Sequence, residues 1–332
     1  MRRLVAALLA LLVAAGLAAA VVAHRLSALA EEAPEALFVV ERGDSLASVA
    51  RKLEEAGLVR DARAVVWLAR LRGLSSKLRA GEYRLSTALT PGEMLTHISE
   101  GRVVAYEVSF PEGFTARQIG ERLEARDLVD AAAFDAAVHD AELAARLGTP
   151  ASSLEGYLYP ETYRLPRGLA PDEIASIMVE HFKQAWRKLQ AQAGDRTLDM
   201  HALVTLASII EKETGAPDER PLIASVFANR LARGMRLESD PTVIYGIPGF
   251  DGNLRRSDLD NGENPYNTYQ IHGLPPGPIA NPGIDSLRAA AHPADTDYLY
   301  FVSRNDGTHV FSRNYRDHVN AVNRYQRRRR SK

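Results

Sequence analysis

Cysteine is absent from the 332 residues of this chain. Its absence excludes disulfide bonds, thiol catalysis and cysteine-ligated metals, and it fits a cytoplasmic protein as well as one of the bacterial envelope. An excess of charge of one sign is also lacking, since 41 Lys and Arg side chains oppose 42 Asp and Glu side chains. A chain near neutrality shows no nucleic-acid-binding signature. The one basic run, Arg327 to Arg330, lies in a C-terminal tail (327–332) that we expect to be solvated.

Several short catalytic motifs are missing too. The sequence contains no H-E-x-x-H zinc motif, no G-x-S-x-G nucleophile turn and no glycine-rich phosphate loop. The nine histidines are scattered, with no pair at metal-ligand spacing. We therefore expect no metal and no cofactor, and we interpret His272, His292 and His309 as structural hydrogen-bonding residues.

The chain has one long apolar run, from Leu4 to Ala23. About twenty apolar residues span a bilayer core. Because Arg2 and Arg3 precede the run, we predict a cytoplasmic N-terminus (1–3), a transmembrane helix (4–23) and an exported remainder. A cleaved signal peptide is the alternative, since residues 28–30 resemble a small-residue cleavage site. The run exceeds the roughly 7–15 residues of a signal h-region, which favours a retained anchor.

Two carboxylates close an otherwise apolar helix, predicted from His201 to Thr214. On a helical wheel Glu213 falls between Leu206 and Ile209, whereas Glu211 falls on the opposite edge of the apolar stripe. A carboxyl group among large aliphatic side chains loses hydration, so its pKa rises and it stays protonated near neutrality, as a general acid requires. The alternative is that both glutamates are rim residues, and the wheel alone prefers Glu213 only mildly.

A long polar connection follows, from Asp251 to Gly283. Loops of this length inside a domain are usually functional or disordered, and the aromatic and amide side chains here argue against disorder. Their stacking faces and neutral hydrogen-bonding groups suit sugars. We predict that Asn267, Thr268, Tyr269 and Gln270 line a sugar site, with a structural loop packed on the core as the alternative.

Five runs with sequence features of a known family occur in order along the chain. They are Leu154 to Tyr163, Ala207 to Thr214, Ser239 to Gly246, Asn267 to Tyr269 and Gly273 to Gly283. Together they resemble the endolytic murein transglycosylases, the YceG-like family, over nearly the whole chain. The resemblance implies cleavage of the β-1,4 bond between N-acetylmuramic acid and N-acetylglucosamine inside glycan strands. It also implies that the second glutamate of the E-K-E-T run, Glu213, is the general acid and then the base, leaving a 1,6-anhydro end.

The same resemblance suggests further site residues and partners. Glu211, Tyr159, Glu161 and Asp240 lie in the matching runs, and we expect them to contact substrate. Asp240 precedes Pro241 and is therefore also typical of a helix N-cap. The implied partners are glycan strands, the bacterial inner membrane that holds the anchor, and peptidoglycan synthases as candidates. The implied role is to terminate or trim nascent strands.

The expected fold class is α+β. After a linker (24–36) we predict a LysM-like subdomain (37–105), a second βα repeat or connecting region (106–150) and a mixed α+β catalytic domain (151–326). The repeat rests on Arg42 to Ser45 recurring as Glu112 to Thr115, each read as a strand, a glycine turn, a Ser or Thr cap and an amphipathic helix. The first copy resembles LysM modules, which bind N-acetylglucosamine polymers. A βα unit without a sugar site is the alternative.

Two other functions stay open. One is a non-catalytic LysM-type glycan-binding scaffold of the envelope, although a scaffold does not need a glutamate on an apolar stripe. The other is a peptidoglycan hydrolase. Such hydrolases usually need two carboxylates flanking the bond, whereas a lytic transglycosylase can use one.

Overall fold

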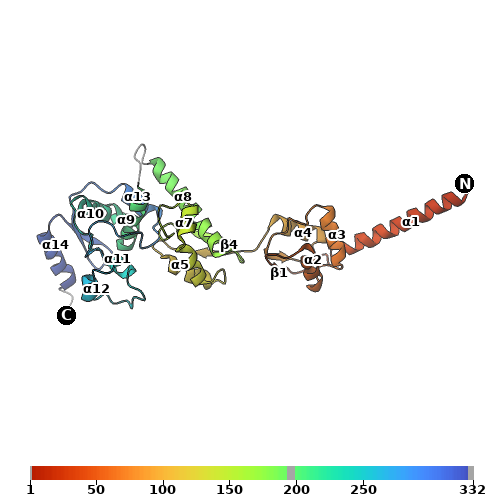
Figure 1. Cartoon of the computed structure of the whole chain (residues 1–332), viewed down its shortest axis with the longest axis horizontal. Coiled ribbons are helices and arrows are strands. Elements are labelled where there is room, and N and C mark those ends of the chain that lie inside the picture. The colour runs from red at the N-terminus through yellow and green to blue at the C-terminus, as the bar shows by residue number, and fades with distance from the viewer. Residues whose placement is uncertain (1, 193–198, 328–332) are drawn as a thin grey trace. The chain divides into compact units, whose positions relative to one another are not determined.

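The computed structural model describes residues 2–192 and 199–327. The chain forms two compact units, Met1–Glu107 with Arg164–Leu169, and Val108–Tyr163 with Ala170–Lys332. Figure 1 colours both along the chain. The chain passes from one unit to the other along β3 (Ala105–Ser109) and β4 (Thr162–Pro166), which pair as a two-stranded sheet. Of the predicted basic tail, residues 328–332 lie outside the described residues.

The first unit begins with α1 (Arg2–Arg25), which has no buried residue. Its most apolar window has a mean hydropathy of 2.8, and α1 is the one helix in the described ranges long and apolar enough to cross a membrane. A signal sequence would have the same properties. The predicted apolar segment is therefore confirmed as a single helix, and its role as an anchor stays a prediction.

The rest of the first unit has the order strand, helix, helix, strand, helix. The elements are β1 (Ala36–Val40), α2 (Leu46–Glu55), α3 (Ala62–Leu71), β2 (Gly81–Leu85) and α4 (Pro91–Glu100). β1 and β2 are antiparallel, with Ala36 opposite Leu85. Because side chains alternate along a strand, Phe38 and Tyr83 point into the core while Leu37 stays exposed.

The second unit is mainly helical. Its helices are α5 (Ala116–Glu124), α6 (Ala131–Val138), α7 (Ala141–Arg146), α8 (Pro171–Gln192), α9 (Met200–Glu213), α10 (Arg220–Ala232), α11 (Asp240–Tyr245), α12 (Arg256–Asp260), α13 (Ile284–Ala291) and α14 (Tyr315–Val322), with a 3-10 turn at Pro217–Glu219 and a π turn at Asn323–Arg327. Near the end of the chain, β5 (Tyr300–Ser303) and β6 (His309–Ser312) pair as an antiparallel hairpin. The mixed α+β class is confirmed.

The predicted repeat has a structural counterpart. β3, α5, α6 and β4 follow the order of β1, α2, α3 and β2, with α7 added. Ser45 caps α2 by accepting from the backbone N–H of Ser48, and Thr115 caps α5 by accepting from that of Gln118. The predicted strand, cap and helix are therefore present in both copies. A sugar-binding role for either copy stays a prediction.

The core of the second unit fixes the direction of α9. Ile209 and Ile210 of α9 join Ile223 and Phe227 of α10 in one buried cluster. α9 also packs against α13. This packing fixes the last turn of α9, where the two glutamates project.

Candidate active site

The helix that carries the glutamates starts and ends as its sequence dictates. Asp199 caps α9 by accepting from the backbone N–H of Ala202, and Glu213 is its last residue. Thr214 has extended backbone angles, and its hydroxyl donates to the Ile210 carbonyl at 2.6 Å. Gly215 then passes so close to the Gly307 carbonyl oxygen that a Cβ atom would lie 2.6 Å from it. Only glycine fits there, so the backbone leaves α9 in one direction.

Glu213 is partly buried and accepts a short hydrogen bond. The Ser239 hydroxyl donates to its Oε1 at 2.6 Å. Burial raises the pKa of Glu213 to about 7, the negative charge of Asp240 adds to the rise, and the Ser239 hydrogen bond opposes it. A carboxyl group with this pKa exchanges its proton near neutrality, as general acid and base catalysis requires.

Glu211 has a different environment. The Gly283 backbone N–H donates to its Oε2 at 3.0 Å, and Nη2 of Arg220 lies 3.4 Å from its Oε1. Only 7% of its side chain is exposed. Arg220 also lies 3.4 Å from Glu112. Because both oxygens of Glu211 have partners, this carboxylate is suited to holding the 283 loop against α9 rather than to giving up a proton.

The loop predicted to bind sugar forms its own internal support. Asn267 is fully buried, and its amide donates to the carbonyls of Asp258, Leu259 and Asn261. Its Oδ1 accepts from the Tyr269 backbone N–H at 3.0 Å. Gln270 donates to the Leu259 carbonyl at 2.7 Å. These contacts stiffen the loop from within.

Thr268 links this loop to the partner of Glu213. Its side chain is fully buried, and its hydroxyl oxygen accepts from the Ser239 backbone N–H at 2.9 Å. It also lies 2.8 Å from the Thr242 hydroxyl. Thr268 therefore holds the residue that donates to Glu213.

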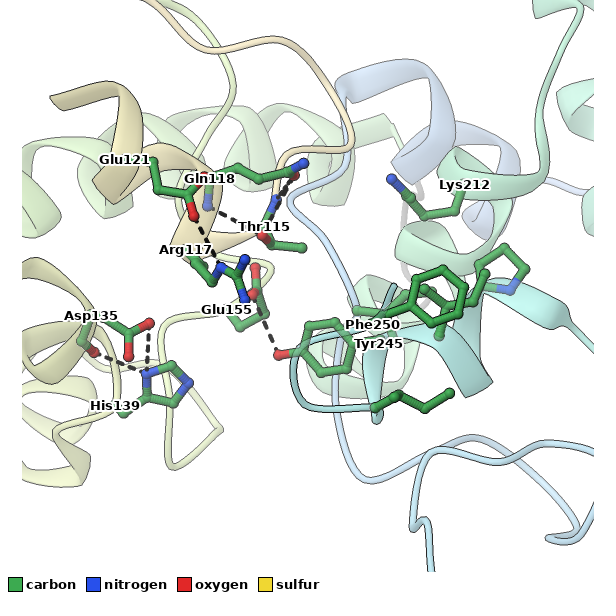
Figure 2. A pocket seen from close by; sticks show the side chains of 14 residues that line it. Thr115, Arg117, Gln118, Glu121, Asp135, His139, Glu155, Lys212, Tyr245 and Phe250 are labelled. Carbon is green, nitrogen blue, oxygen red and sulfur yellow. Dashed lines mark hydrogen bonds and ion pairs between the residues drawn. The ribbon is translucent and has the colours of Figure 1, made fainter. Parts of the chain in front are cut away.

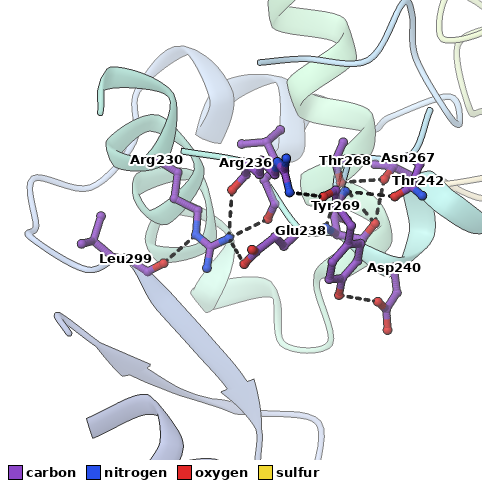
Figure 3. A network of polar contacts seen from close by, with 11 residues as sticks. Arg230, Arg236, Glu238, Asp240, Thr242, Asn267, Thr268, Tyr269 and Leu299 are labelled. Carbon is purple, nitrogen blue, oxygen red and sulfur yellow. Dashed lines mark hydrogen bonds and ion pairs between the residues drawn. The ribbon is translucent and has the colours of Figure 1, made fainter. Parts of the chain in front are cut away.

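Asp240 and Tyr269 form a pair beside that contact (Figure 3). The Tyr269 hydroxyl donates to Oδ1 of Asp240 at 2.7 Å, and burial raises the pKa of Tyr269. The prediction that Asp240 caps the next helix is wrong. Ser239, with an extended backbone, holds the cap position of α11, and Asp240 is the first helical residue. Its exposed carboxylate accepts the hydrogen bond from the Tyr269 hydroxyl instead.

Arg230 supports the segment that leads to Ser239 (Figure 3). It is 6% exposed, and its guanidinium donates to the carbonyls of Arg236 and Leu237, each at 3.0 Å, and to that of Leu299 at 2.7 Å. Glu238 adopts a φ of 53°, in the left-handed region that disfavours side chains. Arg230 lies 2.9 Å from the Glu238 carboxylate and stabilises this turn.

A second carboxyl group with a raised pKa was not selected from the sequence. Glu155 is 5% exposed, and burial raises its pKa to about 7. It accepts from the Ala116 backbone N–H at 3.1 Å and from the Asn281 amide at 2.9 Å. Asn281 in turn accepts from the backbone N–H groups of Gly156 and Leu158. Because these hydrogen bonds tie the start of α5 to two loops, Glu155 is well suited to a structural role. The only sequence signal was its place in the run from Leu154.

Glu155 lines a cavity of about 580 Å³ between α5, α6 and α11 (Figure 2). Tyr245 and Phe250 form one wall of it. Lys212, which precedes Glu213, and Pro241, which follows Asp240, also line it. The cavity is therefore lined by chain neighbours of Glu213 and Asp240, while these two residues are not among its lining residues.

Tyr159 and Glu161 line a different cavity, of about 390 Å³, beside α8. Glu161 is exposed and pairs with His181 at 2.7 Å. The Tyr159 carbonyl accepts from the Tyr163 hydroxyl at 2.6 Å. The structure thus brings Asp240 and Tyr269 together near Glu213. Tyr159 and Glu161 lie at a separate cavity. Over residues 2–192 and 199–327, no cluster of three or more possible metal ligands occurs.

Comparison with known proteins shows which family the chain resembles. A sequence model of the YceG-like family matches residues 38–324. An endolytic murein transglycosylase of Bacillus subtilis (strain 168) is 29% identical over 302 residues, which cover 86% of this chain and 83% of the relative. One from Streptococcus pneumoniae serotype 2 (strain D39) is 27% identical over 84% of this chain, which spans 56% of that longer protein.

A solved structure agrees with these matches. The crystal structure of a yceG-like protein from Listeria monocytogenes superposes with a TM-score of 0.60 at 31% identity, covering 87% of this chain and 99% of the other. Because the family match spans most of the chain, this protein belongs to the YceG-like family.

Proposed function

We propose that this chain is an endolytic murein transglycosylase in which Glu213 is the general acid and then the general base. The observation that carries the proposal is the partly buried carboxyl group at the end of α9, whose pKa burial raises to about 7. The family relatives named for this activity support the reaction class. Release of soluble glycan fragments from purified peptidoglycan by the purified protein is its basic test.

In the reaction, protonated Glu213 donates its proton to the oxygen that leaves C1 of N-acetylmuramic acid. The C1–O bond breaks and leaves an oxocarbenium-like sugar. The Glu213 carboxylate then takes the proton of the 6-hydroxyl of the same sugar, and O6 bonds to C1 to close the 1,6-anhydro ring. Atoms balance without water, and one residue serves twice. The Ser239 hydroxyl occupies Oε1 of Glu213 and leaves Oε2 for the proton.

The residues around Glu213 suggest separate roles in binding and positioning. Asp240 is exposed beside the Tyr269 hydroxyl, so this pair is suited to contacting the glycan. Asn267 and Thr268 are buried and act through the loop and Ser239. The rings of Tyr245 and Phe250 offer stacking faces for further sugars in the 580 Å³ cavity.

A hydrolase would need a second free carboxylate near the bond. Glu211 is poorly suited to that role because Gly283 and Arg220 hold its oxygens, and Asp240, the exposed carboxylate near Glu213, accepts from the Tyr269 hydroxyl. We also infer that α1 anchors the protein in the bacterial inner membrane, with the rest of the first unit and the second unit on the outer side. Its length and hydropathy support this inference.

The pH dependence of the reaction should follow Glu213. Since catalysis starts from the protonated acid, kcat/KM should fall about tenfold per pH unit above the Glu213 pKa of about 7. Asp240→Asn removes a negative charge that raises this pKa, so the alkaline limb should move to lower pH. An alkaline limb that stays in place in this variant would contradict the assignment.

The stability of the fold should also depend on the protonation of Glu213. The folded protein binds the Glu213 proton more tightly than the unfolded chain does. The contribution of this group to the free energy of unfolding is therefore complete below pH 4.5 and is lost as pH rises towards 7.

The tyrosine hydroxyl should matter more for activity than for stability. Tyr269→Phe keeps the partly buried ring but removes the hydrogen bond to Asp240. We expect kcat/KM to fall severalfold with little change in Tm, because one partly exposed hydrogen bond contributes about 0.5–1.5 kcal/mol. Thr268→Val is the matched structural variant and should lower Tm, since the buried Ser239 N–H loses its acceptor. Normal activity in Tyr269→Phe would exclude a substrate role for this hydroxyl.

A further inference from the structure

One exposed face of α3, in the first unit, combines apolar and cationic side chains. Trp67 is 54% and Leu71 is 69% exposed. Arg63 and Arg70 are exposed as well, and the positions 63, 67, 70 and 71 share one side of a helix. We call these four residues the α3 face. Large apolar side chains that gather on a surface mark interaction sites.

A groove of about 360 Å³ lies along this face. Its lining residues are Ala47, Ala62, Val66, Arg63, Trp67 and Arg70. Three of these residues are small and aliphatic, and the other three are two arginines and a tryptophan. Arginine binds phosphate oxygens through paired N–H groups, and tryptophan is enriched where a membrane meets water. Such a groove is suited to an amphiphile with an anionic phosphate head.

The C-terminal end of α1 lies close to α3 (Figure 1), and contacts between side chains and backbone hold it there. Arg25, the last residue of α1, forms an ion pair with Asp61, the residue that caps α3. Arg60 donates to the carbonyls of Ser27 and Ala28, each at 3.0 Å.

The segment after α1 is fixed as well. The backbone N–H groups of Leu29 and Ala30 donate to the Thr87 carbonyl at 2.8 and 3.1 Å. The residues between α1 and β1 are therefore bound to the first unit and do not act as a free tether. If α1 crosses the bilayer, the start of α3 lies at the bilayer surface.

We propose that the α3 face docks on the outer surface of the membrane and binds anionic phospholipid head groups in its groove. The proposal rests on the inferred α1 anchor and is independent of Glu213. A glycan strand is the rival ligand, given the predicted LysM-like character of this unit. The groove favours lipid, because its lining side chains are aliphatic, aromatic or cationic and include none of the amides and hydroxyls that bind sugars. Docking would hold the first unit flat against the bilayer.

The chain contains two tryptophans, which makes this docking measurable. Trp186 is 8% exposed and lies in the second unit. Trp186→Phe therefore leaves Trp67 as the sole tryptophan of the full-length protein. In vesicles of phosphatidylglycerol and phosphatidylcholine with brominated acyl chains, its emission should shift to the blue and be quenched severalfold more than that of Trp186 in the matched Trp67→Phe variant. Equal quenching of the two tryptophans would overturn the proposal.

Further variants and lipid compositions test the role of the arginines, the preference for anionic lipid and the α1 anchor separately. Arg63→Glu combined with Arg70→Glu, in the Trp186→Phe background, should remove most of the quenching while cleavage of soluble glycan is unchanged. Equal quenching in pure phosphatidylcholine would overturn the anionic preference. Protein that fails to float with vesicles would overturn anchor and docking together, whereas flotation without Trp67 quenching would overturn docking alone. Protection of Trp67 from acrylamide by N-acetylglucosamine oligomers, without lipid quenching, would assign the groove to sugar.

Discussion

Replacing Glu213 with glutamine should lower the rate of glycan cleavage by about 10²–10⁴-fold, the usual contribution of a positioned general acid and base. Glutamine keeps the shape of the side chain and still accepts from the Ser239 hydroxyl, but it cannot donate the proton that the leaving oxygen needs. Because the substitution also removes an ionisable group from a partly buried site, the Tm should not fall. Initial rates of fragment release and a thermal unfolding curve measure both effects.

Glu211→Gln is the matched control, two residues away on the same helix. It weakens the contact with Arg220, whose Nε is buried and has no hydrogen-bond partner among the described residues. We expect a loss of about 1–3 kcal/mol in the free energy of unfolding, as for a buried polar group that loses a partner. The folded fraction should retain its activity. The reverse pattern, with activity lost at Glu211 and retained at Glu213, would show that the catalytic residue is Glu211.

Arg230→Met should have the largest effect on stability. The substitution leaves the carbonyls of Leu299, Arg236 and Leu237 without their donor, and each buried group left unpaired costs about 1–3 kcal/mol. We expect the free energy of unfolding, measured by urea denaturation, to fall by about 3 kcal/mol or more. Activity should also fall, because the turn at Glu238 that presents Ser239 to Glu213 loses its support.

Arg236→Met is the corresponding exposed control. The Arg236 side chain lies at the surface and donates to the Tyr269 carbonyl at 2.9 Å. Its loss should cost about 1 kcal/mol or less. If both variants lost the same free energy, burial of the Arg230 network would not be the source of its stabilisation.

The sequence predicted the local features of the site and not its long-range contacts. Periodicity located α9 to within one residue at each end, and the wheel placed Glu213 among aliphatic groups. The hydrogen bond from Ser239 to Glu213 joins residues separated by a 3-10 turn and α10, so no local pattern contains it. Asp240 was misread because an aspartate before a proline is typical of a cap, while its tyrosine partner lies far along the chain.

Composition was ambiguous in the long loop for a related reason. Amides and hydroxyls that bind sugars also bind backbone groups, and only burial separates the two uses. Asn267 and Thr268 use their hydrogen-bonding groups within the protein, whereas Tyr269 keeps part of its surface exposed. The sequence repeat likewise predicted only part of each copy. Its matches defined the first helix of each copy, while the second helices, capped by Asp61 and Asp130, appeared in the structure.

Mass spectrometry of the fragments released from peptidoglycan in water labelled with heavy oxygen tests the role of Glu213 and the reaction class most directly. The expected fragments end in a 1,6-anhydro ring, are lighter by one water than hydrolysis products, and carry no heavy oxygen, because the sugar's own O6 bonds to C1. Glu213→Gln should release them about 10²–10⁴-fold more slowly. Reducing ends that carry heavy oxygen, or anhydro fragments formed at the normal rate by Glu213→Gln, would contradict the proposed mechanism.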